Sequence, residues 1–338
     1  MCGSLFAYRP GRLAAPLLMI SNPIALSTCW NSHRHKNGYE MLEEIASLGF
    51  EYTELSHGVR ITLVPGIHKA LQEGVIKVIS VHNFCPLPHG TQHAAPNLYE
   101  PASLDERERS QWLKYSCRTV DFASQVGAKY MVLHLGSVHF FWRGVVDKLS
   151  NYLDKKKDID PFNDDRYQAM LAKAQDKIRQ RKEKHMDILH DSLDALVPYA
   201  EEKNVTLGFE NREDLEELPM DEDMPPLLDE YTAYQNVGWW YDPGHAQEKF
   251  DFGVQTPEAT LEQNGQYIKG VHFQDYNEEG KGHRALGEGI IDFDPIFPYL
   301  KPETPCILEL SPSASPDGIL HSKEYLEEML RRNTSETV

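Results

Sequence analysis

The 338-residue sequence predicts a single-domain α/β protein, a (β/α)8 TIM barrel. Three observations support this fold class. Short runs rich in β-branched and aromatic residues alternate with amphipathic runs from residue 24 almost to the C-terminal end. Eight such units can be distinguished, and strands that helices separate form parallel sheets buried on both faces. A doubly wound open sheet, the main rival, usually has fewer strands, and no Gly-rich phosphate loop follows the first strand here.

The expected strands are continuous apolar runs bounded by turn residues, as a strand buried on both faces requires. They cover Ile24–Trp30, Phe50–Leu55, Val75–Phe84, Lys129–Gly136, Val205–Asn211, Val237–Asp242, Tyr267–Asp275 and Pro305–Ser311. The expected helices carry apolar residues at helical spacing between these runs. They cover residues 38–49, Leu63–Glu73, Leu104–Val126, His185–Lys203, Pro226–Gln235, Pro257–Asn264, Pro295–Leu300 and 322–332.

Two segments depart from this alternation. Residues 1–20 are expected to be an N-terminal extension, with the barrel covering residues 21–338. Residues 137–184, after the fourth strand, form a polar insertion that begins with Phe140, Phe141 and Trp142. We expect this insertion to form a lid or an oligomer contact, and a hydrophobic plug under a loop is the alternative.

Composition excludes several classes of protein. The net charge of −18 disfavours a protein that grips a nucleic-acid backbone, because such binding depends on clustered Lys and Arg. The basic runs Lys155–Lys157 and Arg179–Lys184 are expected to be solvated helix faces. No stretch is apolar for the eighteen or so residues of a membrane span. The five scattered cysteines form no CxxC pair, which predicts reduced thiols and a cytoplasmic protein.

Polar side chains follow six consecutive expected strands, from the third to the eighth. In chain order they are His82, His134, Glu210, Asp242, His272 and Glu309; His245 and His283 lie in the loops just beyond. In a barrel these positions share one rim, where the active sites of the fold are built. Because crowded carboxylates and imidazoles are unfavourable unless a cation holds them, the sequence predicts a metal site. Mixed nitrogen and oxygen ligands suit zinc, manganese, cobalt or iron.

Each of these residues also has a plainer interpretation when it is taken alone. A single His at a strand end is more often a hydrogen-bonded core residue than a ligand. Asp242 precedes Pro243 and Gly244, and capping that turn would be a sufficient role. Trp30 and Trp240 are expected in the pocket wall or in the barrel core. The metal site is favoured because the plainer interpretations would have to hold for six strands at once.

The motifs GFEN, YDPGHA, GVHFQD, LGEGIIDF and LEL occur in an order and spacing that resemble the xylose-isomerase-like TIM barrels. This superfamily contains sugar isomerases and epimerases, inosose dehydratases and class-two apurinic endonucleases. The resemblance extends from Ile24 to the last helix, and the insertion at residues 137–184 interrupts it. It implies that the metal ligands are Glu210, Asp242, His272 and Glu309. In the epimerases the two glutamates also act as the acid/base pair.

The resemblance also implies contacts for the substrate. His245 matches a histidine that binds a substrate hydroxyl or a second metal, and Arg284 matches a contact to a substrate oxygen. Trp30 and His134 are further candidates for substrate binding. Relatives often form homodimers or homotetramers, which we expect by analogy.

The likeness to the endonucleases extends beyond the four shared ligands. HLGS at His134 resembles their His-Pro-Gly-Ser, His82 matches their histidine on the third strand, and His283 matches a third-metal histidine. The chain departs from that pattern at Lys281, where those enzymes have an aspartate ligand. A third metal should therefore be weak or absent. A second metal bound by His82 and His134 remains open, with Glu210 bridging; His245 and His283 are its further candidate ligands.

Three functions compete at this stage. The first is isomerisation or epimerisation of a sugar, keto-sugar or polyol by one divalent ion, with Glu210 and Glu309 as acid and base; a lyase would use the same residues. The second is hydrolysis of a phosphodiester or other ester by two or three ions, which would need His82 and His134. The third is binding of a metal or ligand without catalysis. We favour the first, with a carbohydrate-like substrate and no nucleic-acid partner.

Overall fold

The computed structural model describes residues 22–140, 146–156 and 159–336. Eight parallel strands close into a barrel in the order β1-β10-β7-β6-β5-β4-β3-β2, so the predicted fold class is confirmed. The strands are β1 (Ile24–Ser27), β2 (Tyr52–Leu55), β3 (Lys77–His82), β4 (Tyr130–Leu133), β5 (Thr206–Glu210), β6 (Val237–Tyr241), β7 (Ile268–Phe273) and β10 (Cys306–Leu308). A short antiparallel hairpin, β8 (Asp275–Asn277) with β9 (Lys281–Arg284), follows β7 outside the barrel.

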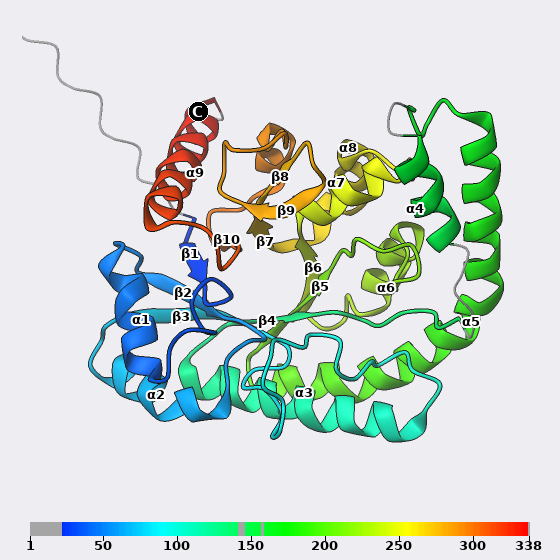
Figure 1. The fold of residues 1–338 in the computed structure, drawn as a ribbon. Helices are drawn as coiled ribbons and strands as arrows, with labels where there is room; N and C mark the ends of the chain where they lie inside the picture. Colours follow the sequence, from blue (N-terminus) through cyan, green and yellow to red (C-terminus); the bar gives the residue numbers. More distant parts are fainter. Residues whose placement is uncertain (1–21, 141–145, 157–158, 337–338) are drawn as a thin grey trace, which may run out of the picture.

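Helices surround the strands, with α2 and α3 below them, α1 to their left, and α7, α8 and α9 above them in the view of Figure 1. Their bounds are α1 (Gly38–Ser47), α2 (Val64–Gln72), α3 (Glu106–Val126), α4 (Val146–Lys155), α5 (Asp165–Glu202), α6 (Met224–Glu230), α7 (Pro243–Asp251), α8 (Pro257–Asn264) and α9 (Pro316–Glu336). Short 3-10 turns are η1 (Ile61–Leu63), η2 (Asp221–Asp223), η3 (Gly265–Tyr267) and η4 (Asp294–Tyr299). The expected helix at Pro295–Leu300 is the 3-10 turn η4, because Pro298 removes a donor that an α-helix would need.

Side chains at the helix starts explain several of these bounds. Asn37 begins α1, Asp105 begins α3, and Thr256 begins α8, each by accepting a hydrogen bond from a backbone N–H of the first turn. Helix α3 ends at Gly127, whose φ of 76° is the left-handed conformation that favours glycine. The chain therefore turns back into β4, which begins three residues later.

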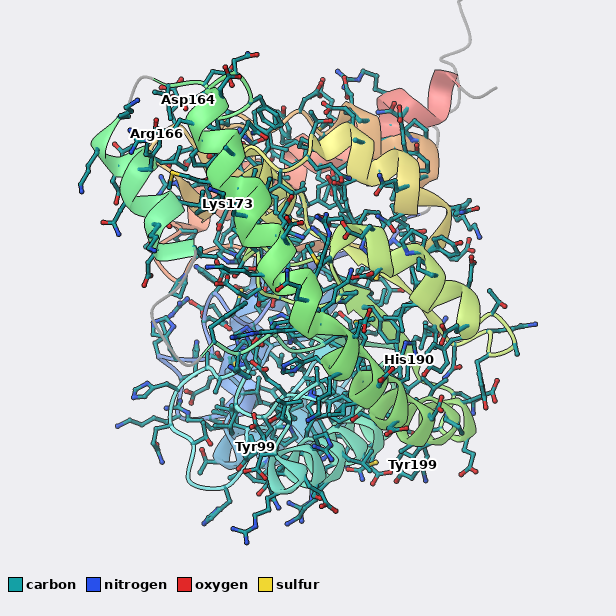
Figure 2. All side chains as sticks on the ribbon, turned by 90° about the vertical axis from the view of Figure 1, so that its right-hand side faces the viewer. Tyr99, Asp164, Arg166, Lys173, His190 and Tyr199 are labelled. Carbon is teal, nitrogen blue, oxygen red and sulfur yellow. The ribbon has the colours of Figure 1, made fainter. Side chains whose placement is uncertain are left out.

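Helix α5 is one continuous 38-residue helix, where the sequence analysis placed the end of an insertion at Lys184 and a new helix at His185. The helix continues because no glycine or proline interrupts it before Pro198. Its buried face also continues through the expected boundary, at Tyr167, Leu171, Ala174, Ile178, His185 and Leu189. At about 1.5 Å per residue it is roughly 57 Å long, and Figure 2 shows it crossing the molecule from Asp164 to Tyr199.

The first turn of α5 is held against the segment that follows α7. The Tyr167 hydroxyl donates to the carbonyl oxygen of Phe252 at 3.0 Å, and Gln168 donates to that of Gly253 at 3.3 Å.

Phe140, in the insertion, lies under the guanidinium of Arg181 on α5, and the centre of the Phe140 ring is 4.5 Å from that guanidinium. Phe141, Trp142 and the N-terminal extension at residues 1–20 lie outside the described residues. A role of this insertion as a lid or oligomer contact stays a prediction.

The barrel interior is filled beneath the carboxyl ends of the strands. Five strands contribute one side chain each to a cluster separate from the main core, namely Ala25, Ile79, Val132, Trp240 and Ile307. The indole of Trp240 fits because its neighbours on β5 and β7 are glycines: a Cβ at Gly208 would come within 2.7 Å of the ring, and one at Gly270 within 2.2 Å. Trp240 thus forms the floor on which the next layer of inward-facing side chains rests.

Candidate metal centre

Four side chains from four strand ends meet in the layer above Trp240. Each offers one ligand atom, and these atoms all lie within 4.8 Å of one another. The four are Glu210, Asp242, His272 and Glu309, and all are buried. Ligands held about 2.0–2.2 Å from a common ion have comparable separations. Three carboxylates and one imidazole are also a donor set that suits a divalent ion, so the residues present fit a metal.

His272 lies at the centre of this group, 5.4 Å from the Trp240 ring. Its Nδ1 is 2.8 Å from Glu210 Oε1 and 3.2 Å from Glu309 Oε2. Burial alone would lower the pKa of His272, but the surrounding carboxylates, first that of Glu309, raise it well above the usual value. Without a metal, a proton on the imidazole therefore takes the place of the cation among the acids.

Glu54, on β2, is a residue that the sequence analysis missed. It is fully buried and accepts hydrogen bonds from Ser27 at 3.0 Å and Ser80 at 2.8 Å. His272 Nε2 lies 3.2 Å from its Oε2, so Glu54 contacts the ring nitrogen that Glu210 and Glu309 do not approach. The pairing of β2 with β3 shifts register between Thr53 and Glu54, and such an irregularity redirects a side chain. In the sequence, the only sign of this role was the acidic residue Glu54 within the strand FEYTEL. A single acid on a strand does not indicate which residue it will contact.

Asp242 combines the two roles that the sequence left open. Its Oδ1 accepts from the backbone N–H of His245 at 3.1 Å and so caps α7. Its Oδ2 accepts from the side chain of Gln274 at 2.7 Å. The strand-to-helix turn at Pro243 and Gly244 thus holds the carboxylate of Asp242 at the barrel mouth. Asp242 therefore caps α7 and still belongs to the group of four candidate ligands.

A second group of candidate ligands adjoins the first and shares Glu210. The ligand atoms of His82, His134 and Glu210 also lie within 4.8 Å of one another. His134 Nε2 is 2.8 Å from Glu210 Oε2, and His82 Nε2 is 3.4 Å from the same atom. Asn97, in the loop after β3, lies 2.7 Å from the other nitrogen of His134 and orients its ring. The structure therefore brings together two of the four histidines proposed for a second metal.

Arg212 lies beside this second group, and the sequence analysis missed it as well. Its Nη1 is 3.0 Å from His134 Nε2 and 3.7 Å from Glu210 Oε2. Its Nε donates to Glu217 at 3.0 Å. Burial lowers the pKa of His134 well below its usual value, and the charge of Arg212 lowers it further. A permanent positive charge at this distance disfavours a second cation on His134.

The other two histidines are arranged differently. Neither His245 nor His283 joins a group of three or more candidate ligands in the described part of the chain. His245 Nδ1 donates to the carbonyl oxygen of Asn211 at 2.8 Å, and His283 Nδ1 donates to that of Glu309 at 3.0 Å. Burial would lower the pKa of His245, yet the carboxylates of Asp242 and Glu213 raise it to about 9. Lys281, the departure from the endonuclease pattern, is exposed and pairs with Glu279 at 2.8 Å.

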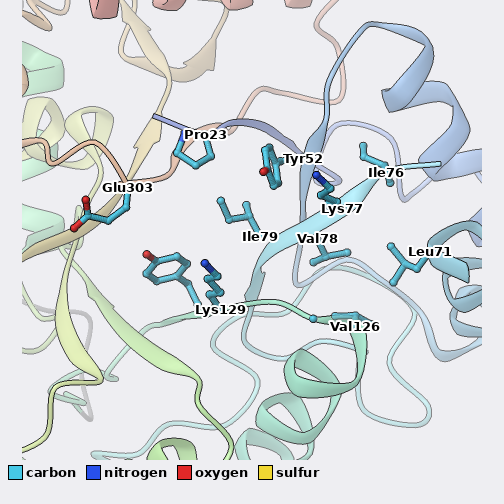
Figure 3. A pocket seen from close by; sticks show the side chains of 12 residues that line it. Pro23, Tyr52, Leu71, Ile76, Lys77, Val78, Ile79, Val126, Lys129 and Glu303 are labelled. Carbon is cyan, nitrogen blue, oxygen red and sulfur yellow. The ribbon is translucent and has the colours of Figure 1, made fainter. Parts of the chain in front are cut away.

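A cavity of about 630 Å³ opens next to the four candidate ligands and is lined by Glu309 and His283. His57, after β2, lines it too; burial and then His82, whose ring centre is 4.7 Å away, lower the pKa of His57 well below its usual value. No described residue of the insertion lines this cavity. A cavity of similar volume, about 640 Å³, lies at the amino ends of β2, β3 and β4 and holds none of the predicted site residues (Figure 3).

Trp30 and Arg284, the two further candidates for substrate binding, do not line the cavity of about 630 Å³ beside Glu309. Trp30 is buried in the main core, and its Nε1 donates to the carbonyl oxygen of Ala314 at 2.9 Å. Arg284 pairs with Glu288 at 3.2 Å and lines a small neighbouring cavity of about 170 Å³, which shares His283 with the larger one. Contact of either residue with substrate stays a prediction.

Comparisons with known proteins agree with the observed fold. A family described as "Xylose isomerase-like TIM barrel" matches residues 42–329. No match was found among curated proteins.

No helix within the described ranges is long and apolar enough to cross a membrane.

Solved structures with a similar fold include several sugar epimerases. A D-tagatose 3-epimerase-like protein is 19% identical with a TM-score of 0.62, over 94% of this chain and 100% of that one. An L-ribulose 3-epimerase is 12% identical with a TM-score of 0.63, over 94% and 97%. The 3-keto-D-glucoside 4-epimerase of E. coli is 16% identical with a TM-score of 0.60, over 91% and 99%. At these identities the likeness establishes the fold.

Proposed function

Because the chain belongs to the xylose isomerase-like TIM barrel family, we propose that it is a divalent-metal-dependent isomerase or epimerase of a sugar, keto-sugar or polyol. A related lyase would use the same residues. One observation carries the proposal: Glu210, at the end of β5, and Glu309, just after β10, both approach Nδ1 of His272, at 2.8 and 3.2 Å. Two carboxylates that share one candidate ion while coming from separate strands can address two faces of a bound molecule.

Glu210, Asp242, His272 and Glu309 would hold the ion. A divalent ion at this place polarises a carbonyl and makes the neighbouring C–H more acidic. Manganese, zinc, cobalt and iron all suit the donors. A single ion fits best, because Arg212 already places a positive charge against the second group.

The two glutamates would move the proton. One carboxylate takes it from the carbon next to the carbonyl, and the other returns a proton to the opposite face or to the neighbouring oxygen. Burial would raise the pKa of Glu210, but His272 and His134 lower it well below the usual value, so this side chain stays ionised. The cavity beside Glu309 would hold the rest of the substrate.

The substrate class proposed for this chain is taken from the names of the similar solved structures alone. The L-ribulose and 3-keto-D-glucoside epimerases with this fold are named for the sugars they act on, and a third protein is described as D-tagatose 3-epimerase-like. We extend to the present chain only the class of polyhydroxylated carbonyl compounds.

A second candidate is a hydrolase with two ions, because His82, His134 and Glu210 form a separate group of candidate ligands. Two ions that share Glu210 could hold a nucleophile and a leaving group. The contact of Arg212 with His134 weighs against this arrangement, so we rank it second.

Metal analysis and hydrogen exchange test the first proposal together. The purified protein is loaded with each candidate ion, the ions per chain are counted, and ketoses are incubated with it in deuterated water. We expect one ion per chain and entry of deuterium at the carbon next to the carbonyl of at least one ketose.

Glu210→Gln and Glu309→Gln should abolish the exchange, since a glutamine cannot accept the proton. Glu303→Gln is the matched control, because Glu303 is exposed and lines the cavity at the other end of the barrel. Two ions per chain, loss of one in His134→Ala, and ester cleavage without exchange would favour the hydrolase instead.

A further inference from the structure

Gln274 is a buried amide between a candidate metal ligand and the β8–β9 hairpin, which lies beside α7 (Figure 1). It directly follows β7 and is 1% exposed. Its side-chain nitrogen donates to Asp242 Oδ2 at 2.7 Å, and its side-chain oxygen accepts from the backbone N–H of His283 on β9. An ionised carboxylate only accepts and an N–H only donates, so these two partners fix the orientation of the amide.

Two glycines enclose this amide. A Cβ at Gly244, in the first turn of α7, would come within 2.6 Å of Gln274 Cδ, and one at Gly282 within 2.8 Å of the amide oxygen. Glycine permits such a close approach because it has no side chain. The packing therefore restricts the amide to the position in which both of its hydrogen bonds form.

His283, at the other end of this contact, has an uncommon backbone conformation. Its φ is 54°, a left-handed value that residues other than glycine keep only where surrounding contacts hold them. Its Nδ1 donates to the carbonyl oxygen of Glu309, and its own carbonyl oxygen accepts from the N–H of Ser311 at 2.8 Å. Because His283 lines the cavity of about 630 Å³, Gln274 and the segment after β10 together fix this part of the cavity wall.

These contacts form a continuous path of hydrogen bonds between two candidate ligands. The path runs from Asp242, after β6, through Gln274 and His283 to the backbone of Glu309, after β10; in the barrel β7 separates these two strands. Asp242 keeps lone pairs for an ion, because a carboxylate has about four and this one accepts two hydrogen bonds from described residues. An ion on Asp242 would therefore restrain Gln274 and, through it, His283.

We propose that Gln274 is a positioning residue that couples ion binding at Asp242 to the placement of His283 in the cavity wall. The ion restrains the carboxylate, the carboxylate restrains the amide, and the amide restrains the hairpin. The inference rests on the proposed function, because it needs an ion at the four candidate ligands. It adds an order of events: the ion binds first and completes the wall against which the substrate is then placed.

Amide hydrogen exchange of the full chain, measured by mass spectrometry with and without zinc, tests the coupling in the unaltered protein. We expect zinc to slow exchange in the hairpin, residues 275–284, by about tenfold, a common size for coupling between two sites. The reference is the turn between α1 and β2, at residues 48–51, which the path of hydrogen bonds does not include. Equal protection of both segments, or protection of neither, would overturn the inference.

Gln274→Met removes both hydrogen bonds at a similar side-chain length. It should weaken zinc binding about tenfold, because the hydrogen-bonding partners of ligating groups commonly contribute that much. Zinc should also no longer protect the hairpin more than the reference turn. A purely structural role would instead speed hairpin exchange by the same factor with and without zinc. Gln247→Met is the matched control, because Gln247 donates to Asp251 within α7.

Gly282→Ala tests the coupling even if Gln274→Met does not fold. The added methyl group would press on the amide oxygen of Gln274 while both partners of the amide stay in place. It should reduce the selective protection of the hairpin in the same direction as Gln274→Met. Selective protection that stays unchanged in both variants would refute the role of Gln274.

Failure of this inference is distinguishable from failure of the proposed function. Zinc binding with deuterium entry into a ketose, but without selective protection of the hairpin, would keep the isomerase and refute the coupling. Selective protection that Gln274→Met abolishes, without deuterium entry into any ketose, would keep the coupling and refute the proposed reaction.

Discussion

Glu54 and His272 face each other at 3.2 Å inside the barrel, from strands that are 218 residues apart in the sequence. The contact uses Nε2 of the imidazole and leaves Nδ1 directed at Glu210 and Glu309. A carboxylate behind a metal-binding histidine fixes its tautomer and increases its basicity. If His272 binds an ion as proposed, Glu54 would orient it to do so through Nδ1, although Glu54 is not one of the four candidate ligands.

Glu54→Gln should weaken metal binding by about 10- to 100-fold, because the amide cannot supply the negative charge behind the imidazole. The dissociation constant is measured by competition with a chelator. Glu51→Gln, an exposed position just before β2, is the control and should leave the affinity unchanged. Equal affinity in both variants would show that Glu54 is only a buried hydrogen-bond acceptor.

Arg212→Met should lower the free energy of unfolding by about 3–5 kcal/mol, because it leaves Glu217 and Glu213 without their buried counter-charge. The double variant Arg212→Met/Glu217→Gln should recover part of this loss. Denaturant titrations of the four proteins of this cycle measure the coupling. If the losses in unfolding free energy of Arg212→Met and Glu217→Gln simply add up to that of the double variant, the ion pair between these two residues contributes no specific stability.

The metal-free protein should lose stability as the pH rises from 7.5 to 9. The pKa of His245 is about 9 in the folded chain and about 6.5 in an unfolded one, so its contribution is complete below 6.5 and is lost as the pH rises through 9. From pH 7.5 to 9 the loss is about 1.5 kcal/mol. His272, whose pKa is also raised, adds to it in the same direction. Urea titrations at the two pH values should show a smaller loss in His245→Asn, and an equal loss in both proteins would contradict the role of His245.

Gly270→Ala should destabilise the protein by about 1–3 kcal/mol, since the new methyl group would overlap the Trp240 ring. The thermal midpoint and denaturant titration both measure this change. Gly318→Ala serves as the control, because the added Cβ there meets its nearest atom at an ordinary 3.4 Å. A similar effect of both substitutions would mean that the Trp240 floor can shift.

Much of the metal centre could be predicted because barrel topology converts position along the chain into position in space. Placing Glu210, Asp242, His272 and Glu309 at the ends of parallel strands predicts that they converge, and their candidate ligand atoms lie within 4.8 Å of one another; that they bind a metal stays a prediction. Strand ends were less well predicted. Trp30 lies beyond β1, which ends at Ser27, because apolar composition marks burial and does not mark where the ladder of hydrogen bonds stops.

Glu54 and Arg212 could not be found in this way. Each is one charged residue in or just after an ordinary strand, and its importance comes entirely from its partners. The partners of Glu54 are on β1, β3 and β7, and Arg212 reaches the histidine after β4. No local pattern encodes such distances.

The sequence by itself determined the barrel, the rim and the candidate ligands, because hydrophobic periodicity and strand order act along the chain. Tertiary structure alone decided which charged groups touch: the carboxylate behind His272 and the guanidinium against His134. The physical reason is that the energy of a buried charge depends on atoms within a few ångströms of it, and these atoms come from distant parts of the sequence.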